Sequence, residues 1–488
     1  MDKILKRTIP PLDKLQQLSY WQLSKCVDHS CSTGVATLLT AVLLISSTER
    51  SLSFAEEISP ISITATTVPG VTLSLDADIR AIDFTVDEQE SLHLGWILNP
   101  TRSRLAQEKI FYARGDRGGA SWSQPQKLAD NCPKFVRVLV TTDGVHVLCG
   151  NKLRHFFSSD GGNSWRELAP LLSDTEGYAL VSDVISVNDG LIAAYLGRSI
   201  VTSESTKKEI GLYITKWSSN KLTTPLRIAS LVGNSPIALR LAANEDHLHL
   251  LCTISDERQI KEKNYTRFES SVQLFYLQSQ NIGITWSSPV EISLNESQGV
   301  TVKPSGIQTI GETIELLPLG QELFAFYHNI DLYTTYTADG STWSPPVNIT
   351  SYQPSWLAAA FYSRSVSAAA VNGHGRLVWI DSRYRKSDRQ WWKPLGGWPW
   401  SDAPDWANND IFTLPLSDIV AIVKGGQQLR HVITPQRLTP PLSYADQVQL
   451  RASHTRLFMV WSGRRKVGKQ FDTFEQPAEL FYTVLPLP

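Results

Sequence analysis

The feature that most limits what this chain can fold into is a short turn pattern that recurs four times. Residues 158–165 read SSDGGNSW, with serine, aspartate, glycine and tryptophan at offsets 0, 2, 4 and 7. Residues 279–286 (SQNIGITW) keep every offset with asparagine in place of aspartate, and relaxed copies occur at 116–122 (DRGGASW) and 337–343 (TADGSTW). Each copy follows a strand-like apolar run, so the pattern predicts four hairpin turns.

The residue types explain such a turn. An aspartate or asparagine accepts hydrogen bonds from backbone N–H groups, glycine supplies a positive φ, and a hydroxyl group caps the turn. The tryptophan starts the next strand and packs its ring between layers. The residues predicted to build these turns are Ser158, Asp160, Gly162, Trp165, Ser279, Asn281, Gly283, Trp286, Asp116, Trp122, Asp339 and Trp343.

This pattern resembles the Asp-box, S-x-D-x-G-x-[ST]-W, of the sialidase-like β-propellers. The resemblance implies an all-β propeller in which the box is a structural hairpin, remote from the ligand-binding face. On this basis we expect Asp160 to belong to the scaffold rather than to a catalytic site.

A second repeat gives the number of blades. Strand-like runs end on a large or buried residue seven times, at intervals from 46 residues (Cys149 to Tyr195) to 82 residues (Trp379 to Trp461), which suits propeller blades with two insertions. The seven positions are Trp96, Cys149, Tyr195, Cys252, Phe326, Trp379 and Trp461. We predict seven four-stranded blades over 56–488, with six, the number in true sialidases, as the alternative. Residues 60–68 are predicted to complete the last blade by pairing with 479–485.

The N-terminal segment differs from the rest. Residues 34–45 (GVATLLTAVLLI) form an apolar run behind several basic residues, too short for a comfortable membrane span but suited to a signal peptide. We predict an export signal over 1–55 with cleavage near Ala55, and hence a secreted, periplasmic or other extracytoplasmic protein. The alternative is a membrane anchor formed by 34–45. The long basic stretch also allows translation to start downstream of Met1.

Composition and motifs argue against several kinds of function. Lysine and arginine (46) balance aspartate and glutamate (47), so global charge gives no support for nucleic-acid binding. His93, His146 and His249 recur at matching places in three repeats, so we expect partly exposed strand histidines rather than a metal site. No cofactor-binding motif occurs in the sequence.

The cysteines are expected to remain reduced. A hairpin turning on Asp143-Gly144 would set Cys149 opposite Val138 and leave Cys132 about 20 Å away, beyond the reach of a disulfide. Only a chain reversal at Pro133 would bring the two together. We therefore predict Cys132, Cys149 and Cys252 as small core residues.

The connections between the second and third strands of each blade are predicted to form the ligand-binding face, because Asp-box turns lie on the other face. Two insertions fall there: 255–270, expected as a charged loop, and 382–410, a tryptophan-rich loop. The tryptophans are Trp391, Trp392, Trp398, Trp400 and Trp406. Their rings could stack on a sugar or a protein partner, or pack on one another as a lid.

Arginines gather near the start of the first strand of several blades, where they would surround the ring axis. The predicted ligand-binding set is Arg80, Arg137, Arg240, Arg364 and Arg451, with Arg383 from the tryptophan-rich loop. Guanidinium groups arranged in this way would bind a carboxylate, sulfate or phosphate. The alternative is that each arginine pairs with a nearby acid such as Asp183, Glu315 or Asp381.

Two functions follow. The resemblance implies the sialidase set of three arginines, an aspartate acid and a tyrosine–glutamate pair, but residues 78–82 (DIRAI) keep only the arginine of the family's F/Y-R-I-P motif. The candidate catalytic residues are Arg80, Tyr362, Glu315 and Asp78. We favour an exported, non-catalytic propeller that binds an acidic glycan or a protein partner, as a monomer and without cofactor, metal ion or nucleic acid. The alternative is a sialidase-like glycoside hydrolase acting on an acidic glycan.

Overall fold

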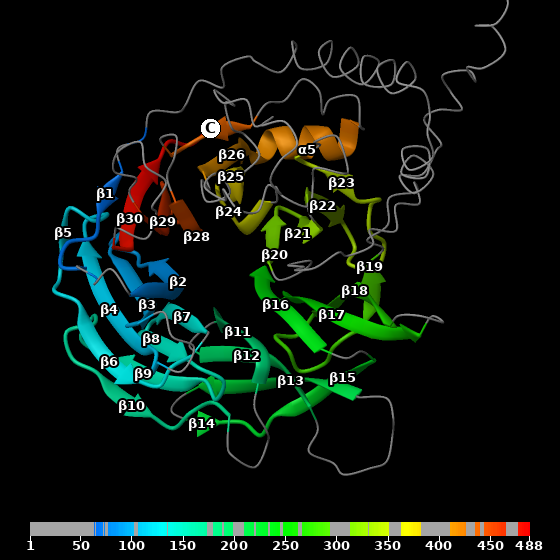
Figure 1. Cartoon of the computed structure of the whole chain (residues 1–488), viewed down its shortest axis with the longest axis horizontal. Helices are drawn as coiled ribbons and strands as arrows, with labels where there is room; N and C mark the ends of the chain where they lie inside the picture. The colour runs from blue at the N-terminus through cyan, green and yellow to red at the C-terminus, as the bar shows by residue number, and fades with distance from the viewer. Residues whose placement is uncertain are drawn as a thin grey trace, which may run out of the picture. The chain divides into compact units, whose positions relative to one another are not determined.

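The protein folds into a ring of antiparallel β-sheets, as the computed structural model shows (Figure 1). The structure describes residues 63, 65–71, 73, 77–101, 106–133, 135–172, 179–187, 190–198, 209–218, 221–232, 235–244, 247–261, 266–292, 313–329, 331–350, 363–381, 410–425, 435–439, 444–464 and 477–488. The chain divides into two compact units, Met1–Ile58 and Ser59–Pro488. All described residues belong to the second unit, so the predicted export signal over 1–55 lies outside them.

Seven sheets, or blades, make up the ring, and the first strand of each lies nearest the middle (Figure 1). Blade 1 holds β2 (Asp78–Val86), β3 (Leu92–Asn99) and β4 (Lys109–Asp116), with β5 (Ser121–Trp122) and β6 (Gln126–Asp130) both paired to β4. Blade 2 holds β7 (Val136–Thr141), β8 (Gly144–Cys149), β9 (Arg154–Ser158) and β10 (Arg166–Leu168). Blade 3 holds β11 (Ala179–Val187), β12 (Gly190–Arg198) and β13 (Glu209–Ser218), with β14 (Lys221–Leu222) and β15 (Leu226–Val232) paired to β13.

The other four blades follow the same plan. Blade 4 holds β16 (Ser235–Asn244), β17 (His247–Lys261), β18 (Thr266–Ser279) and β19 (Val290–Ile292). Blade 5 holds β20 (Ile314–Leu319), β21 (Glu322–Asn329), β22 (Asp331–Thr337) and β23 (Val347–Asn348). Blade 6 holds β24 (Ser363–Val371), β25 (His374–Asp381), β26 (Asp410–Pro415) and β27 (Gln436–Arg437). Blade 7 holds β28 (Tyr444–Ala452), β29 (Leu457–Arg464), β30 (Glu479–Leu485) and β1 (Thr66–Thr67). The predicted all-β propeller of seven blades is confirmed.

The two ends of the second unit close the ring in blade 7. Thr66 pairs with Tyr482 and Thr67 with Phe481, and the Val68 N–H donates to the Leu480 carbonyl at 2.9 Å. An N-terminal strand therefore supplies the outermost strand of the C-terminal sheet, as predicted for 60–68 and 479–485. Closure of this kind removes the sheet edge that the last blade would otherwise expose.

Apolar side chains fill the spaces between neighbouring blades. The seven positions predicted as buried core residues are all buried, and six of them face the preceding blade. Blade 5 differs by one residue. Phe326 faces blade 6, and it is Tyr327 that packs with Leu251 and Tyr276 of blade 4. Because side chains alternate along a strand, a shift of one residue exchanges the two faces.

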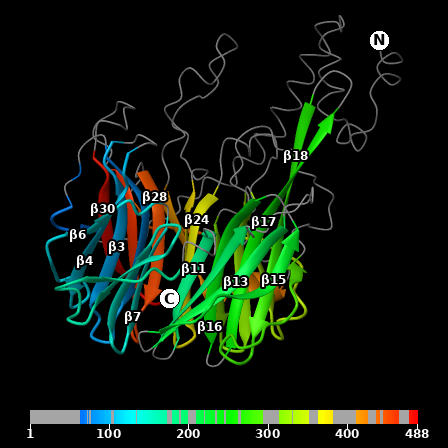
Figure 2. The same ribbon diagram turned by 90° about the horizontal axis from the view of Figure 1, so that it is seen from below.

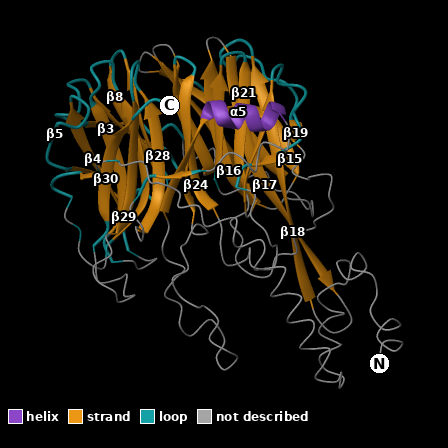
Figure 3. Ribbon diagram, turned by 90° about the horizontal axis from the view of Figure 1, so that it is seen from above, coloured by secondary structure: helices purple, strands orange, loops and turns teal. Residues whose placement is uncertain are grey.

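Residues 255–270, expected as a loop, instead continue two strands of blade 4. β17 and β18 stay paired from Leu248↔Ser279 to Lys261↔Thr266, whereas the neighbouring strands β16 and β19 pair only as far as Ser255 and Leu274. The pair therefore extends past the rest of its sheet as a two-stranded ribbon. Figures 2 and 3 show this ribbon projecting from the ring.

Blade 6 has a helix, α5 (Leu416–Gly425), where other blades have an Asp-box turn. Its apolar face buries Leu416, Ile419 and Ile422, and the Lys424 ammonium pairs with Glu322 of blade 5 at 2.8 Å. The sequence had not predicted it. Within the described part of the chain, no helix has the length and apolar character needed to cross a bilayer. Residues 382–409 of the tryptophan-rich loop lie outside the described residues.

Cys132 and Cys149 form a disulfide, with Cα atoms 5.4 Å apart, so the prediction of reduced thiols was wrong. The hairpin places Cys149 opposite Val136 rather than Val138. The chain also reverses at Pro133, whose carbonyl accepts a backbone N–H two residues later. This reversal brings the two sulfur atoms together and joins the end of blade 1 to blade 2.

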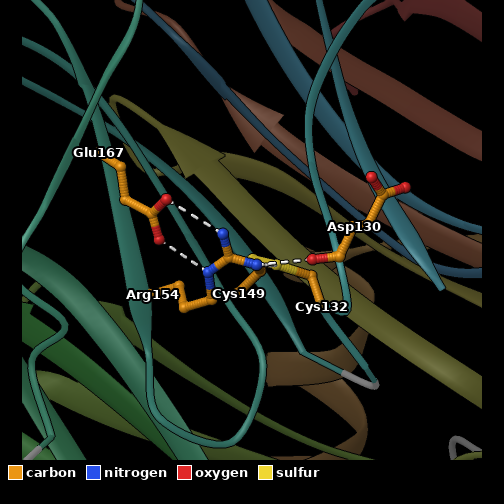
Figure 4. Close-up of a disulfide and its surroundings, with 5 residues drawn as sticks. All are labelled: Asp130, Cys132, Cys149, Arg154 and Glu167. Carbon is orange, nitrogen blue, oxygen red and sulfur yellow. Dashed lines mark hydrogen bonds and ion pairs between the residues drawn. A yellow bond between two sulfur atoms is a disulfide. The ribbon is translucent and has the colours of Figure 1, made fainter. Parts of the chain in front are cut away.

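Arg154 covers this disulfide (Figure 4). Its guanidinium donates to both oxygens of Glu167, at 2.8 and 3.1 Å, and to the Asp130 carbonyl at 2.6 Å. Cys252 is free and buried, as predicted, and burial raises the pKa of its thiol to about 12.

Candidate functional site

The Asp-box turn of blade 2 directs its polar groups into its own backbone. The Ser158 hydroxyl donates to Asp160 at 2.7 Å and accepts the Gly162 N–H at 2.7 Å. The Asp160 carboxylate also accepts the backbone N–H and the hydroxyl of Ser164 at 2.9 and 2.6 Å. These bonds from Ser164 and Ser158 hold the pKa of Asp160 well below its ordinary value. The carboxylate is engaged as a turn acceptor.

Two of the other copies make the same bonds with different residues, whereas in blade 1 the Asp116 carboxylate pairs with Arg114 at 2.8 Å. In blade 4 the Asn281 side-chain oxygen accepts the Thr285 N–H at 2.8 Å. In blade 5 Asp339 accepts the N–H groups of Ser341 and Thr342, each at 2.8 Å. An amide and a carboxylate therefore serve equally, because the turn needs only an oxygen acceptor.

Each Asp-box turn also contacts the preceding blade. A Cβ on Gly162 would collide with the Tyr112 ring of blade 1, and one on Gly119 would collide with the Tyr482 ring of blade 7. Trp165 stacks edge-on against Tyr112 with ring centroids 4.7 Å apart, and Trp343 meets Tyr276 of blade 4 in the same way at 5.0 Å. Gly119 and Gly162 are required because the neighbouring aromatic ring leaves no room for a side chain, and at Gly340 the Gln278 side chain of blade 4 has the same effect.

The recurring histidines lie in this same layer. His93 and His249 each bond through Nδ1 to a tyrosine hydroxyl, at 2.7 Å (Tyr112) and 2.8 Å (Tyr276). His146 bonds to His155 at 2.9 Å. All three lie in strands, as predicted, but His93 and His146 are buried rather than partly exposed, at 1% and 0% exposure. His146 also packs edge-on against Trp217 of the next blade, with ring centroids 5.1 Å apart.

Seven side chains at one level of the innermost strands form what we call the axial ring. Each stands one residue after the partner of the residue that faces the preceding blade, which is Tyr327 in blade 5 and the predicted core residue in the others. For example, Asp83 follows Ile82, which pairs with Trp96. The members, in blade order, are Asp83, Arg137, Asp183, Arg240, Glu315, Ser367 and Gln449.

The residues in one half of the axial ring are linked to one another by ion pairs and hydrogen bonds. Arg137 donates to Asp183 at 2.6 Å and to Asp83 at 3.2 Å. Arg451, two residues beyond Gln449, reaches Asp83 at 2.6 Å. Both aspartates are almost fully buried, at 2% and 1% exposure.

The same aspartates also bind the backbone of the following blade. Asp83 accepts the Val138 N–H at 2.9 Å, and Asp183 accepts the Leu241 N–H at 2.8 Å. Ser367 does so through its hydroxyl, which accepts the Leu450 N–H at 3.0 Å. These bonds fix the height of one innermost strand against the next.

The other half of the axial ring is much less occupied. Arg240 donates one hydrogen bond, to the carbonyl of Leu239 at 3.1 Å. Glu315 accepts one long bond, from the Leu316 N–H at 3.3 Å. Among the described residues, no ion pair joins Arg240 to Glu315, and the Gln449 amide has no hydrogen bond. All three side chains are partly exposed.

Electrostatics separate the two halves. Burial opposes the charge of Arg137, but Asp183 and Asp83 raise its pKa, and burial of Asp183 is outweighed by Arg137 and Arg240, which lower its pKa. In contrast, burial and then the nearby Arg137 lower the pKa of Arg240. Burial raises the pKa of Glu315 against the attraction of three arginines, Arg240, Arg451 and Arg137.

The structure brings together only part of the predicted site. Arg137, Arg240, Arg451 and Glu315 meet at the ring axis, together with Asp183, which the alternative had named as a partner. Asp381, also named there, instead accepts the Trp379 indole N–H at 3.3 Å. Arg80 lies outside the ring, 37% exposed and paired with Asp78 at 3.3 Å. Tyr362, Arg383, the Arg364 side chain and the loop tryptophans Trp391, Trp392, Trp398, Trp400 and Trp406 lie outside what the structure describes.

Sequence reasoning missed Ser367 and Gln449 as members of the axial ring. Neither residue stands in a motif, and their places follow only from strand register. Arg137 and Arg240 are equivalent, as predicted, since each pairs with the residue before its core cysteine.

A separate hollow of ≈ 390 Å³ lies where turns between first and second strands meet. Its polar lining includes Asp87 of blade 1, Asn372 of blade 6, and Ser453 and His454 of blade 7. This is the face of the Asp-box turns, opposite the predicted ligand-binding face.

Comparisons with known proteins give matches of structure alone. No family model and no curated protein matches the chain. It is similar to a protein of unknown function from Dyadobacter fermentans DSM 18053, with TM-score 0.41, 10% identity, and 87% of this chain and 99% of that chain covered. It is also similar to the intramolecular trans-sialidase from Ruminococcus gnavus (0.39, 11%, 88% and 98%) and to the α-L-arabinanase from Penicillium chrysogenum (0.38, 11%, 87% and 98%). The sheet topology itself identifies the chain as a seven-bladed β-propeller.

Proposed function

We propose that this protein is an exported, non-catalytic propeller that binds a glycan. The observation that carries the proposal is the state of the carboxyl groups in the axial ring. Asp83 and Asp183 are each held by an arginine and by a backbone N–H of the next blade. Glu315 is the ring's one carboxyl group without a direct arginine contact among the described residues. Glycoside hydrolysis uses two available carboxyl groups, so this arrangement favours binding.

The charges of the ring bear on which glycan is bound. Three arginines face three carboxyl groups, so an acidic ligand meets no excess of positive charge at the axis. Donors and acceptors stand beside one another, which suits hydroxyl groups, since each both donates and accepts. Acidic glycans, favoured by the sequence, and neutral glycans therefore both belong in the test.

Export is supported by the Cys132–Cys149 disulfide. Disulfides persist in oxidising compartments and are rare where thiols are kept reduced. A disulfide joining two blades agrees with the signal-like segment at 34–45.

The test is a glycan array, with neutral and acidic oligosaccharides, probed with the full chain and followed by analysis of each bound sugar for cleavage products. We expect binding to a defined subset with no product released. Binding to no glycan on the array would contradict the proposal and favour a protein partner.

A glycoside hydrolase is the second candidate, and the opposite pKa shifts of Glu315 and Asp183 favour it. One carboxyl group with a raised pKa near another with a lowered pKa is an arrangement that acid catalysis uses. Cleavage products that disappear in the variant Glu315→Gln would establish this alternative and remove the non-catalytic proposal.

A further inference from the structure

We propose that Arg240, Glu315 and Gln449 form a binding site at the ring axis for vicinal hydroxyl groups of an uncharged sugar. This proposal rests on the proposed function and names its site and ligand class. The three residues come from blades 4, 5 and 7 and share one level of the axial ring. They lie in the half of the axial ring that is outside the ion-pair network of Asp83, Arg137 and Asp183.

The first argument is the number of unused hydrogen-bonding groups. A guanidinium carries five N–H donors, and Arg240 uses one. A carboxyl group offers about four acceptor positions, and Glu315 uses one. The Gln449 amide adds both a donor and an acceptor, neither of which is used among the described residues. Because all three side chains are partly exposed, these groups are open to solvent and available to a ligand.

The second argument is the distance between opposite charges. Arg240 and Glu315 influence each other's ionisation, yet no ion pair within 4.0 Å joins them in the described structure. Arg137, the equivalent of Arg240 in blade 2, contacts Asp183 at 2.6 Å and Asp83 at 3.2 Å. A group between Arg240 and Glu315 must therefore accept from the arginine and donate to the carboxylate. A hydroxyl group does both, and a carboxylate of the ligand would face Glu315 unfavourably.

The third argument concerns rigidity. The Asp183 and Ser367 side chains bind backbone N–H groups of β16 and β28, so the strands that carry Arg240 and Gln449 are held in place before a ligand arrives. A preorganised site loses less entropy on binding.

The experiment measures affinity by isothermal titration calorimetry with matched probes that differ only in one carboxylate. The pairs are glucose with glucuronic acid and galactose with galacturonic acid, each presented as its methyl glycoside. We expect the full chain to bind at least one neutral member better than its acidic counterpart at neutral pH. Preference for the acidic member of both pairs would overturn the proposal, as would the absence of binding by all four.

Variants locate the site. Glu315→Gln is expected to weaken the neutral probe about tenfold to a hundredfold, and Gln449→Leu about twofold to tenfold. Gln449 makes no side-chain hydrogen bond in the described structure, so its replacement should fold with unchanged melting temperature even if Glu315→Gln does not. Lys127→Gln, which removes an exposed cation paired with Asp130 at 3.1 Å, is the matched control and should bind normally.

The outcomes separate this inference from the proposed function. Glycan binding that survives both ring variants would place the ligand elsewhere on the propeller, which sinks the axial site and leaves the function standing. Cleavage of the glycan would remove the non-catalytic function, while loss of affinity in Gln449→Leu would still locate the ligand at the axis.

Discussion

The Asp-box turns at the rim and the axial ring at the middle both tie consecutive blades together, but their bonds differ in reach. In the turn, Asp160 and Ser158 bond to groups at most four residues away, and Gly162 and Trp165 meet the preceding blade. At the axis, Asp83 reaches Val138 in the next blade and Arg451 at the far end of the chain. The rim is therefore built from local segments, and the axis from distant ones.

This difference predicts how each region responds to change. A local turn can exchange one acceptor for another, as Asn281 does for aspartate, because the backbone groups it serves move with it. At the axis, the loss of one partner leaves a buried charge that no neighbouring group can move to neutralise. Substitutions should consequently be far more damaging at the axis than at the rim.

The largest effect is expected from Asp83→Ala. This change removes a nearly buried carboxylate from Arg137 and Arg451 and leaves the Val138 N–H without its acceptor. We expect a loss of about 3–5 kcal/mol in the free energy of unfolding, measured by chemical denaturation. A loss below about 1 kcal/mol would show that the axial ring does not hold the blades together.

Gly162→Ala comes next and tests the contact between a rim turn and the preceding blade. Its φ of +94° disfavours a side chain, and the new Cβ would strike the Tyr112 ring. Gly373, with φ +78° and nothing within 4 Å of a Cβ, is the matched control for backbone strain alone. We expect a loss of about 3 kcal/mol for Gly162→Ala against about 1–2 kcal/mol for Gly373→Ala. Equal losses would mean that the contact between blades contributes nothing.

Acidification should act on the histidines between blades. Burial, with His146 nearby, lowers the pKa of His155 from 6.5 to about 3, and burial, with His247 nearby, lowers that of His249 to about 4. The unfolded chain then binds protons that the folded chain does not, so stability is lost as pH falls below 6.5. We expect a loss of about 2 kcal/mol per histidine from about pH 7 to about pH 5.

The measurement is the free energy of unfolding against pH for the protein and for His249→Gln. The variant should show a shallower decline over this window. Parallel curves would indicate that His249 is not held neutral by its packing.

The smallest effect is expected from Asp160→Asn at the rim. An amide fills the same role in blade 4, where Asn281 accepts the Thr285 N–H at 2.8 Å. Only a slight decrease in melting temperature should follow, and glycan binding should not change. Loss of binding with an unchanged melting temperature would return Asp160 to the candidate site residues.

The same contrast explains which parts could be predicted from sequence. The rim turns could be predicted because a spacing within eight residues encodes them. The number of blades and the pairing of β1 with β30 could be predicted because the strand pattern repeats along the chain. The axial ring depends on register. Glu315 takes its place because Tyr327, not Phe326, faces blade 4, and no local pattern distinguishes those two.

The disulfide and the blade 4 ribbon were missed for a related reason. The distance between Cys132 and Cys149 turned on where one hairpin reversed and on the bend at Pro133. Charged residues at 255–270 suggested a solvated loop, yet the same residues continue the pairing of β17 with β18.

Seven blades impose a parity problem on the axis. Signs that alternate around a closed ring require an even number of members, and here they alternate through Asp83, Arg137, Asp183, Arg240 and Glu315 before two uncharged residues intervene. Arg451 continues the alternation of charge only because its side chain contacts Asp83 from a position two residues beyond Gln449. The break in this alternation therefore follows from the number of blades rather than from any one residue. A six-bladed ring could alternate its charges without a break, whereas this seven-bladed one has the uncharged Ser367 and Gln449 between Glu315 and Asp83.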